Sequence, residues 1–360
     1  MKKINVGILG GTGMVGQRFV TLLANHPWFE IATIAASERS AGKTYREAVS
    51  GRWAMVEGIP THVADLVVKN VMELDAIADE VDFVFCALDM NKDATRALED
   101  AYAKKETPVV SANSAHRWTP DVPMIIPEIN PGHLDIIAAQ RARLGTKHGF
   151  VVVKPNCSIQ SYVPALHAIA EFKPVKVSVC TYQAISGAGK TFKSWPEMED
   201  NIIPFIGGEE EKSEKEPLKV WGRIEGNKIV SASEPVISAQ CIRVPVTDGH
   251  LAATSVSFEI KPTLERIVEK WRAFKAKPQQ LKLPSAPIPF MSYFEENDRP
   301  QTRLDRDADN GMGITVGRLR EDNLFDYKFV SLSHNTVRGA AGGAILTAEL
   351  LKAEGYLAAK

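Results

Sequence analysis

The sequence Ile-Asn-Val-Gly-Ile-Leu-Gly-Gly-Thr-Gly-Met-Val-Gly, residues 4–16, is the strongest indication of the fold class. A short apolar run ends in a glycine-rich turn, and apolar residues then repeat at helical spacing as far as Leu23. Glycines at this spacing allow a tight turn, close approach of the backbone to a pyrophosphate, and close packing of the helix on the strand. The stretch is therefore typical of a dinucleotide-binding site. The expected cofactor contacts here are Gly10, Thr12, Gly13, Met14, Val15 and Gly16.

The sequence after this turn alternates between strand and helix patterns. Apolar runs typical of buried strands cover residues 30–36, 82–88, 108–112 and 150–153, and helical patterns cover 92–104 and 133–143. This alternation is typical of a parallel sheet with helices on both faces. We therefore expect an α/β fold in which a Rossmann-type, doubly wound parallel sheet occupies the first part of the chain.

The second half of the sequence has a different pattern, with longer strand-like segments. Long strand-like segments occupy residues 175–185, 229–246 and 251–260, and shorter ones follow at 314–320 and 327–333. In residues 251–260, apolar and polar side chains alternate, which is typical of a sheet with one buried face. A chain of 360 residues is also too long for one typical core. We expect a second domain of the α+β class with a mixed sheet.

Two further segments bear on the architecture. The run 209–219 is rich in glutamate and lysine, which is typical of a solvated loop or an exposed helix. The stretch 339–357 is rich in alanine and leucine, which favours a helix. We expect this last helix to return to the first domain and to pack against it.

Composition and charge argue against several classes of protein. The formal net charge is −1 and the charges are spread along the chain, which argues against nucleic-acid binding. No apolar stretch has the length of a membrane span, and no signal-peptide cleavage site follows the N-terminus. The 4 cysteines lack CxxC spacing, so neither a disulfide framework nor a metal site is expected. The expected compartment is the cytoplasm.

Cys157 stands in the stretch Val-Val-Val-Lys-Pro-Asn-Cys-Ser-Ile-Gln, residues 151–160. Pro155 ends a strand-like run and a helix can begin after the cysteine, so the thiol is expected at a strand-to-helix corner. Free backbone N–H groups and the positive end of the helix favour a thiolate there. The alternative is a cysteine that packs as a small hydrophobe. That role is expected for the cysteines within apolar runs: Cys86, Cys180 and Cys241.

The end of the second predicted strand bears on the choice of cofactor. The chain continues there as Ser-Glu-Arg-Ser-Ala-Gly-Lys, residues 37–43. Ser37, Arg39 and Ser40 offer donors for the 2′-phosphate of NADP, whereas a carboxylate at this place is typical of NAD sites. Glu38 favours NAD. The segment as a whole favours NADP, with a merely solvated basic loop as the alternative.

A second polar cluster lies at Arg-Val-Pro-Val-Thr-Asp-Gly-His, residues 243–250. Histidine carries protons near neutral pH and can activate a thiol, which suits His250. The guanidinium of Arg243 can hold a carboxylate through paired hydrogen bonds. Taken alone, each residue is more often an ordinary surface side chain.

Taken together, these segments resemble the aspartate-β-semialdehyde dehydrogenase family, and its archaeal and fungal branch more than the branch typical of many bacteria. The resemblance covers nearly the whole chain. The motifs that carry it are Gly-Gly-Thr-Gly-Met-Val-Gly (10–16), Ser-Ala-Asn-Ser-Ala-His-Arg (111–117), Pro-Asn-Cys-Ser (155–158), Gln-Ala-Ile-Ser-Gly-Ala-Gly (183–189), the segment 243–250 and His-Asn-Thr-Val-Arg-Gly-Ala-Ala-Gly-Gly (334–343). Several motifs in one order are more specific than any of them alone.

The resemblance implies an activity. A member of this family uses NADPH to convert L-aspartyl 4-phosphate into L-aspartate 4-semialdehyde and phosphate, in the biosynthesis of lysine, methionine, threonine and isoleucine. Cys157 would carry the aspartyl group as a thioester, and His250 would move protons. Asn156 and the backbone N–H of Cys157 would stabilise the oxyanion.

The resemblance also implies substrate contacts. Gln183 would position the substrate, Arg243 would bind its α-carboxylate, and Glu216 would bind its ammonium group. The remaining implied contacts are Arg117 and Lys219 for the phosphate and Asn335 near the nicotinamide. Glu216 and Lys219 stand in a run of charged residues that offers several alternatives.

A division of the chain follows from the same resemblance. Residues 1–156 would form an NADP-binding Rossmann domain, completed by a C-terminal helix within residues 336–360. Residues 157–335 would form the catalytic and oligomerisation domain of a homodimer or homotetramer.

Other functions are compatible with parts of this pattern. A malonyl-CoA reductase resembles the same branch and would use the same cysteine with NADPH, but it needs no carboxylate for an ammonium group. An N-acetylglutamyl-phosphate reductase shares the chemistry, yet its usual Gly-Cys-Tyr-Pro-type segment differs from Asn-Cys-Ser-Ile here. A catalytically inactive relative that only binds NADP predicts loss of the thiol, the imidazole or the substrate cations, and all of these are present.

Overall fold

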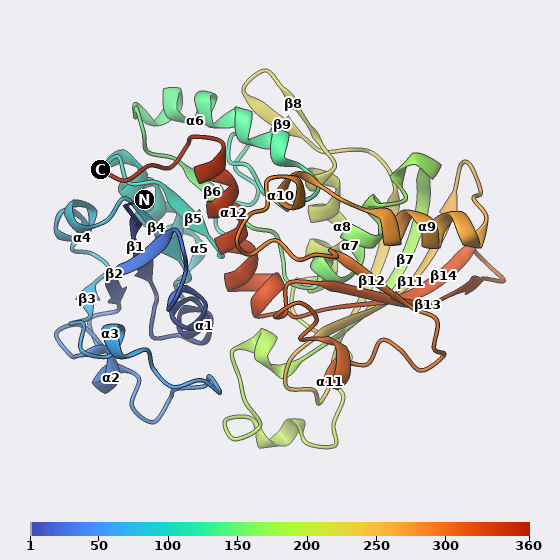
Figure 1. Ribbon diagram of the computed structural model, residues 1–360, viewed down its shortest axis with the longest axis horizontal. Coiled ribbons are helices and arrows are strands. Elements are labelled where there is room, and N and C mark those ends of the chain that lie inside the picture. Colours follow the sequence, from blue (N-terminus) through green and yellow to red (C-terminus); the bar gives the residue numbers. More distant parts are fainter. Residues whose placement is uncertain (1) are drawn as a thin grey trace.

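The computed structural model describes residues 2–360. Its first part is built on a sheet with the strand order β3-β2-β1-β4-β5-β6 (Figure 1). The strands are β1 (Ile4–Leu9), β2 (Phe29–Ala36), β3 (Lys69–Asn70), β4 (Phe83–Cys86), β5 (Val109–Ser111) and β6 (Val151–Val153). Neighbouring strands pair in parallel. This is the strand order of the Rossmann fold, so the predicted doubly wound sheet is confirmed.

The two faces of this sheet bury different apolar cores. Phe83 and Phe85 of β4 belong to a core shared with α1 (Met14–Leu23) and α12 (Gly342–Ala353). Val84 and Cys86 belong to a core shared with α4 (Leu74–Glu80) and α5 (Lys92–Lys104). Because side chains alternate across a strand, one apolar run serves both faces. The other helical segments of this part are α2 (Tyr45–Ala48), α3 (Thr61–Ala64), η1 (Pro131–Ile136) and α6 (Ile137–Leu144).

The second part is built on a mixed sheet with the order β10-β7-β11-β14-β13-β12. The outermost pairs are parallel and the inner pairs antiparallel. The strands are β7 (Pro174–Gln183), β10 (Val236–Arg243), β11 (His250–Phe258), β12 (Met291–Phe294), β13 (Ile314–Glu321) and β14 (Tyr327–Ser333). The larger helices α7 (Ile159–His167), α8 (Glu209–Val220) and α9 (Leu264–Ala273) lie together on one side of it (Figure 1). The predicted α+β domain with a mixed sheet is confirmed.

Shorter elements connect these layers. They are the hairpin β8 (Arg223–Glu225) and β9 (Lys228–Val230), the helices α10 (Lys277–Gln280) and α11 (Thr302–Asp305), and the 3₁₀ turns η2 (Ala170–Phe172), η3 (Ile185–Ala188) and η4 (Pro196–Met198). Among the helices of residues 2–360, none has both the length and the apolar character needed to cross a bilayer.

The other face of the mixed sheet is more open. On β7, the outward-facing residues Lys176, Ser178, Cys180 and Tyr182 alternate with buried ones. The antiparallel neighbour β11 places Leu251 and other half-buried side chains on the same face. Cys180 is therefore partly exposed, and the prediction that it belongs to the core is wrong, whereas Cys86 and Cys241 are buried as predicted.

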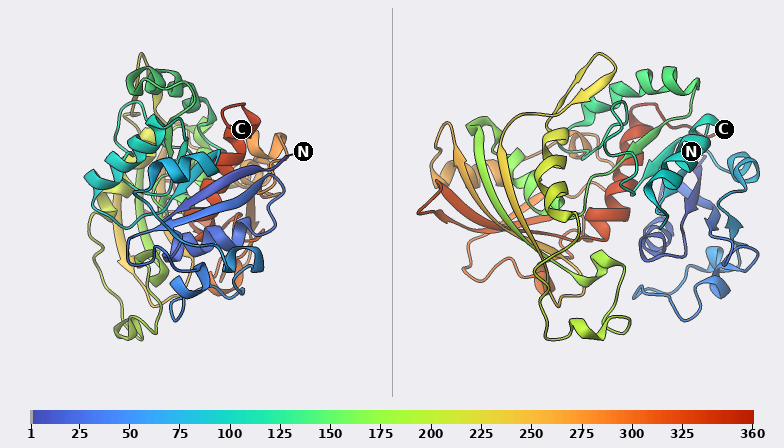
Figure 2. Two further views of the ribbon diagram at one scale, coloured as in Figure 1. Left: turned by 90° about the vertical axis from the view of Figure 1, so that its left-hand side faces the viewer. Right: turned by 180° about the vertical axis from the view of Figure 1, so that it is seen from behind.

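The C-terminal segment crosses back to the first sheet. After β14 the chain forms a π-helical segment, η5 (Val337–Ala341), and continues into α12, which lies between the two sheets in Figures 1 and 2. Every residue from Gly342 to Leu351 is buried. Carboxylate oxygens of Asp82 accept the N–H groups of Asn5 and Lys360 at 2.7 Å each. The two ends of the chain therefore lie side by side (Figure 2).

A buried ion pair holds the beginning of this C-terminal segment, η5, in place. The guanidinium of Arg338 donates two hydrogen bonds to the carboxylate of Glu128, and the side chains are only 1% and 0% exposed. Arg338 also donates to Gln160 on α7 at 3.3 Å and lies over the ring of Phe290, 4.8 Å from its centre. One side chain thus joins segments from both parts of the molecule.

Some boundaries differ from the predictions. The segment 229–246 forms β9 and β10 rather than one strand, with Pro235, which has no N–H to donate, just before β10. The pattern at 133–143 begins as the 3₁₀ turn η1 before α6. The run 209–219 is a helix, but it is not simply exposed, because Glu209, Ser213, Glu216 and Lys219 are buried on one face of α8.

We expect Arg338→Met to lower the free energy of unfolding by about 3–5 kcal/mol, because it leaves the Glu128 carboxylate buried without its partner. Urea denaturation followed by circular dichroism measures the loss. Arg46→Met is the matched control, since its pair with Asp65 is exposed, at 63% and 84%, and should cost less than about 1 kcal/mol. Equal losses in the two variants would contradict the anchoring role of Arg338.

Candidate active site

A cleft of about 600 Å³ brings the glycine turn and Cys157 together. Gly13, Met14 and Val15 line it from the first part of the chain. Cys157 and the loop after β7 line it from the second part. This volume lies in the range of small-molecule sites.

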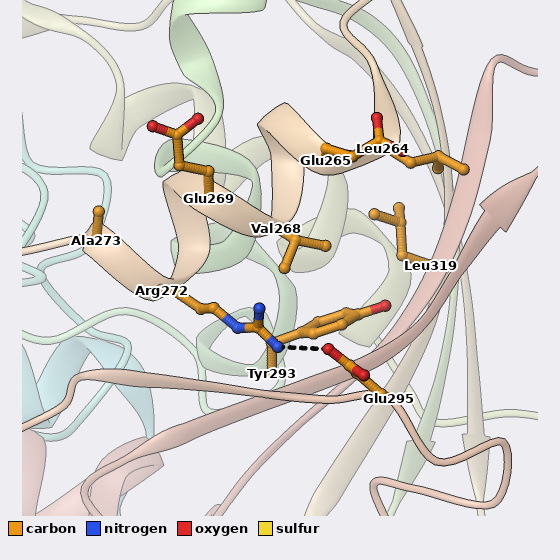
Figure 3. Close-up of a pocket in the computed structure, with 9 residues that line it drawn as sticks. All are labelled: Leu264, Glu265, Val268, Glu269, Arg272, Ala273, Tyr293, Glu295 and Leu319. Carbon is orange, nitrogen blue, oxygen red and sulfur yellow. Dashed lines mark hydrogen bonds and ion pairs between the residues drawn. The ribbon is translucent and has the colours of Figure 1, made fainter.

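A hollow of about 680 Å³ lies elsewhere, between α9 and the strands β12 and β13 (Figure 3). An ion pair between Arg272 and Glu295, 2.8 Å long, spans part of it beside Tyr293. This hollow is slightly larger than the cleft, but the thiol, the imidazole and the glycine turn do not line it. The chemistry of the chain therefore points to the cleft.

The glycine turn has the shape that a dinucleotide requires. Gly10 adopts a φ of +86°, and a Cβ at Gly16 would lie 2.2 Å from the carbonyl oxygen of Gly10, so a larger residue at Gly16 would push the helix off the turn. Gly13 caps α1 and opens into the cleft. The N-terminus of a helix attracts a phosphate, so these residues fit a pyrophosphate.

A pocket of about 190 Å³ continues from the turn to the end of β2. Gly10, Thr12 and Ser37 line it, together with Arg52. Nη2 of Arg52 donates to the hydroxyl of Ser40 at 3.3 Å. Arg39 is exposed beside this pocket rather than in its lining. Arg52 could not be identified from sequence, because it stands beyond the loop that follows β2 and only the fold brings it back to the end of that strand.

Cys157 and His250 form the reactive pair of the cleft. The sulfur lies 3.4 Å from Nε2 of His250. Nδ1 of the same ring accepts the backbone N–H of Ala184 at 3.1 Å. The proton of the neutral imidazole is therefore carried by Nε2, which faces the sulfur.

Burial governs the ionisation of both groups. It lowers the pKa of His250 to about 3, with a further contribution from the Arg243 guanidinium. It also raises the pKa of the Cys157 thiol, as does the charge of Glu209, while Lys154, Arg117 and Arg243 act in the opposite direction. His250 is thus neutral at physiological pH and acts toward the sulfur as a hydrogen-bond donor.

Strand register brings Gln183, Arg243 and His250 together. β7 and β10 are parallel and end side by side with Gln183 opposite Arg243. The neighbouring β11 runs antiparallel and begins at His250 at the same edge of the sheet. A Cβ on Gly187 would lie 2.8 Å from Nη1 of Arg243 and 3.0 Å from Nε2 of His250. The loop after β7 therefore packs directly on these two side chains.

Asn156 and Glu209 are bound to each other beside the nucleophile. The amide nitrogen of Asn156 lies 3.0 Å from both oxygens of Glu209, and its amide oxygen accepts from the N–H and hydroxyl of Ser158. Glu209 also accepts from Gln183 at 3.3 Å and Lys212 at 2.7 Å. The side chain of Asn156 is thus hydrogen-bonded to Glu209 and Ser158, and its expected role as an oxyanion donor stays a prediction.

Burial opposes ionisation of Glu209, but the ammonium of Lys212 and the hydrogen bonds from Asn156 and Gln183 outweigh it, so the pKa of this carboxyl lies below its ordinary value. Glu209 is therefore an anion within the site. Glu209 was not among the residues expected from sequence, which pointed instead to Glu216, two turns later on α8.

Glu216 and Lys219 have structural contacts instead. Glu216 accepts from Nη1 of Arg117 at 3.0 Å and from the N–H of Asn156 at 2.6 Å. Nζ of Lys219 donates to three main-chain carbonyls, of Arg117, Thr119 and Val122, and burial lowers its pKa to about 8. These atoms bond to protein groups in this structure, and the expected contacts of Glu216 and Lys219 with substrate stay predictions.

The other predicted contacts lie at the cleft. Arg117 lines both the cleft and an adjoining pocket of about 230 Å³ that it shares with Lys212. Asn335 lines the cleft, accepts the N–H of Gly249 at 2.8 Å and donates to the hydroxyl of Ser186 at 2.8 Å. The carboxamide of Asn335 thus connects the C-terminal segment to the loops around His250.

Comparison with known proteins agrees with this site. Residues 5–137 match the family model described as "Semialdehyde dehydrogenase, NAD binding domain", and residues 165–338 match "Semialdehyde dehydrogenase, dimerisation domain". The aspartate-semialdehyde dehydrogenase of Archaeoglobus fulgidus is 44% identical over 97% of this chain and 98% of that protein. That of Aspergillus fumigatus is 42% identical over 99% of each.

Solved structures give the same result. The crystal structure of aspartate semialdehyde dehydrogenase with NADP from Candida albicans has a TM-score of 0.89 and 39% identity, and it covers 99% of this chain and 100% of that one. Aspartate semialdehyde dehydrogenase II complexed with ASA, from Vibrio cholerae, has a TM-score of 0.73 and 25% identity over 99% and 100% of the two chains. The chain therefore belongs to the aspartate-semialdehyde dehydrogenase family of oxidoreductases, with archaeal and fungal relatives as its sequence motifs predicted.

Proposed function

We propose that the protein reduces L-aspartyl 4-phosphate with NADPH to L-aspartate 4-semialdehyde and phosphate, in the biosynthesis of the aspartate family of amino acids. The observation that carries this proposal is that Cys157 lines one cleft together with a dinucleotide-type glycine turn, and that its sulfur lies 3.4 Å from the buried His250. The relatives from Archaeoglobus fulgidus and Aspergillus fumigatus carry the name aspartate-semialdehyde dehydrogenase, which supports the proposal.

The residues of the chain divide the reaction into steps. The sulfur of Cys157 attacks the acyl phosphate, the C–O bond to phosphate breaks, and a thioester forms. NADPH, when bound, supplies the hydride that reduces the thioester. Collapse of the resulting hemithioacetal releases the semialdehyde and the Cys157 thiolate, which accepts a hydrogen bond from Nε2 of His250. The backbone N–H of Cys157 stays the proposed oxyanion donor.

The proposed NADP site extends from the cleft into the adjoining pocket at the end of β2. The turn at Gly10, Gly13 and Gly16 would hold the pyrophosphate. Ser37 and Ser40, with Arg52, would hold the 2′-phosphate in the adjoining pocket. Arg39 would contribute from the rim. Asn335 would lie near the nicotinamide.

The substrate contacts are revised by the packing of α8. Glu209, next to Gln183 and in the field of Arg243, would bind the ammonium group in place of Glu216. Arg243 would bind the α-carboxylate. Lys212, which shares a pocket with Arg117, would bind phosphate in place of Lys219.

These contacts favour an amino-acid substrate over the alternatives. The buried carboxylate of Glu209, beside Gln183, can bind the ammonium group of an amino-acid substrate. Malonyl-CoA and acetylglutamyl phosphate carry no such group. Steady-state kinetics with aspartyl phosphate, malonyl-CoA and acetylglutamyl phosphate in parallel would separate the functions. A higher kcat/KM for either alternative would contradict the proposal.

The assembly and the domain boundaries are part of the same proposal. The match to a dimerisation domain over residues 165–338 supports oligomerisation, and we assign the contact to the open face of the mixed sheet. The assembly would be a homodimer or homotetramer in the cytoplasm. The domains would be residues 1–156 with the helix of 336–360, and 157–335.

Cys157→Ala should reduce the rate of NADP reduction, with aspartate semialdehyde and phosphate as substrates, by at least about 10³-fold, because the covalent route is lost. NADP binding, measured by fluorescence titration, should be unchanged. Cys180→Ala is the control, since that thiol lies partly exposed on the open face of the sheet. Turnover in Cys157→Ala equal to that of the control would disprove the assignment of the nucleophile.

Arg243→Leu should raise the KM for aspartate semialdehyde about 10- to 100-fold, with little change in the KM for NADP. The reason is the loss of a charged hydrogen bond to the α-carboxylate, which contributes about 1.5–3 kcal/mol. Initial-rate kinetics with each substrate varied in turn measure both constants. An unchanged KM for the semialdehyde would exclude Arg243 from substrate binding.

Glu209→Gln and Glu216→Gln test the revised assignment against the original one. Glu209→Gln should raise the KM for aspartate semialdehyde about tenfold or more, because a charged partner of the ammonium group is lost. Glu216→Gln should mainly lower the thermal unfolding temperature, since Arg117 loses its buried counter-ion. If the two effects were exchanged, the assignment made from sequence would stand.

A further inference from the structure

Lys190 stands just after η3, the 3₁₀ turn that follows β7, and the reaction described above gives it no role. Among the residues that line the cleft, three carry cationic side chains: Arg117, Lys154 and Lys190. Lys190 lines the cleft from the second part of the chain, whereas Gly13 and Val15 of the glycine turn line it from the first part. Lys190 is also exposed. This lysine therefore borders the space that the cofactor occupies when bound.

The other two cations of the cleft are bound by protein groups. Arg117 donates to a carboxylate oxygen of Glu216 at 3.0 Å and to the main-chain carbonyl of Lys154 at 3.1 Å. Nζ of Lys154 donates to two main-chain carbonyls, and this residue is only 3% exposed. Nζ of Lys190, in contrast, forms no hydrogen bond or ion pair with any residue of the described range 2–360. All donors of its ammonium are thus left for a ligand.

The main chain on both sides of Lys190 is held in place by hydrogen bonds. Before it, the N–H of Gly189 donates to the carbonyl of Ser186 at 2.9 Å, and Gly189 adopts a φ of +67°, which glycine favours. After it, the N–H of Thr191 donates to the hydroxyl of Ser194 at 2.9 Å. The fold therefore fixes the base of Lys190, while the four-carbon side chain itself stays flexible.

The glycine turn lacks a cation of its own. The N–H groups at the start of α1 can bind a pyrophosphate, but residues 10–16 contain no lysine or arginine. A helix N-terminus offers about half a positive charge, which does not neutralise a pyrophosphate. A lysine ammonium binds phosphate groups as a point charge. Lys190 can supply that charge from the other part of the molecule.

The reactants carry two other phosphate groups, and Lys190 lines the proposed pocket of neither. The pocket at the end of β2, proposed for the 2′-phosphate, is lined only by residues between Gly10 and Met90. The pocket that Arg117 shares with Lys212, proposed for the substrate phosphate, does not include Lys190 in its lining. The acidic residue of the cleft lining is Asp89, and within residues 2–360 it forms no ion pair with Lys190. These placements favour the pyrophosphate as the partner of Lys190.

We propose that Lys190 is a cofactor-binding residue that holds the pyrophosphate of NADP from the second part of the molecule, across the cleft from the glycine turn and the N-terminus of α1. The cofactor is then bound by both parts at once, so that its binding also stabilises their relative position. The inference rests on the NADP site proposed above, in which the pyrophosphate lies at the glycine turn.

The test is the affinity for NADPH in the absence of substrate, read from the fluorescence of the cofactor. Lys190→Met should weaken NADPH binding about five- to tenfold at low ionic strength. The difference from the wild type should shrink in about 0.5 M NaCl, because salt screens the interaction. Lys193→Met is the matched control: Lys193 is exposed on the same loop but does not line the cleft, so this variant should keep the wild-type affinity.

ADP-ribose identifies the phosphate that Lys190 binds, because it carries the pyrophosphate but neither the 2′-phosphate nor the nicotinamide. Its affinity, measured by displacement of NADPH, should fall in Lys190→Met by the same factor as that of NADPH. A loss for NADPH with none for ADP-ribose would assign Lys190 to the 2′-phosphate and overturn the proposal. A raised KM for inorganic phosphate with unchanged NADPH affinity would assign it to the substrate and would also overturn the proposal.

Lys190→Arg separates the charge from any change in the loop. Arginine keeps the positive charge, so its NADPH affinity should stay within about twofold of the wild type. Equal losses in Lys190→Arg and Lys190→Met, or no loss in either, would overturn the proposal. NADPH binding and turnover of aspartate semialdehyde by the wild type are measured alongside. A failure of the proposed function is then seen in the wild type itself, whereas a failure of this inference is seen only in the Lys190 variants.

Discussion

The structure depends on the return of the C-terminal segment to the first sheet, which the buried pair of Arg338 and Glu128 fixes. The glycine turn lies in one part of the chain and Gln183, Arg243 and His250 lie in the other, so the shape of the cleft depends on the relative position of the two parts. Arg338 contacts Glu128 in one part and Gln160 and Phe290 in the other. The same segment carries Asn335 into the cleft and sets Gly339 against Cys157. The buried ion pair of Arg338 and Glu128 thus stabilises both the position of the C-terminal segment and the cleft that this segment lines.

Much of the fold was predictable from sequence because its strands are long and strongly patterned. The strand at 327–333 and the helix at 92–104 have the predicted limits. Short elements such as β3, with two residues, carry too little pattern to be recognised. On β7 a clear pattern led to a wrong prediction. Cys180 stands in an apolar run, but side chains alternate across the strand and Cys180 faces away from the core.

Candidate site residues could be chosen from sequence where a motif contains only one residue of the required chemical type. Gln183 and Arg243 end β7 and β10, and His250 begins the neighbouring β11 at the same edge of the sheet. Cys157, which follows β6 of the other sheet, lies 3.4 Å from His250. On α8 the pattern repeats: Glu209 with Lys212 and Glu216 with Lys219 have the same spacing, and sequence alone does not say which turn of the helix reaches the cleft. Arg52 was missed for a similar reason, since only tertiary packing returns it to the end of β2.

The position of α12 has a consequence for how the chain folds. The strands of the first sheet are made first on the ribosome, but one face of that sheet is covered by residues 342–353. Domains usually fold in the order in which they are synthesised. Here the earliest part exposes the apolar side chains of β1 and β4 until the last helix arrives, so the nascent chain presents a hydrophobic surface throughout most of its synthesis.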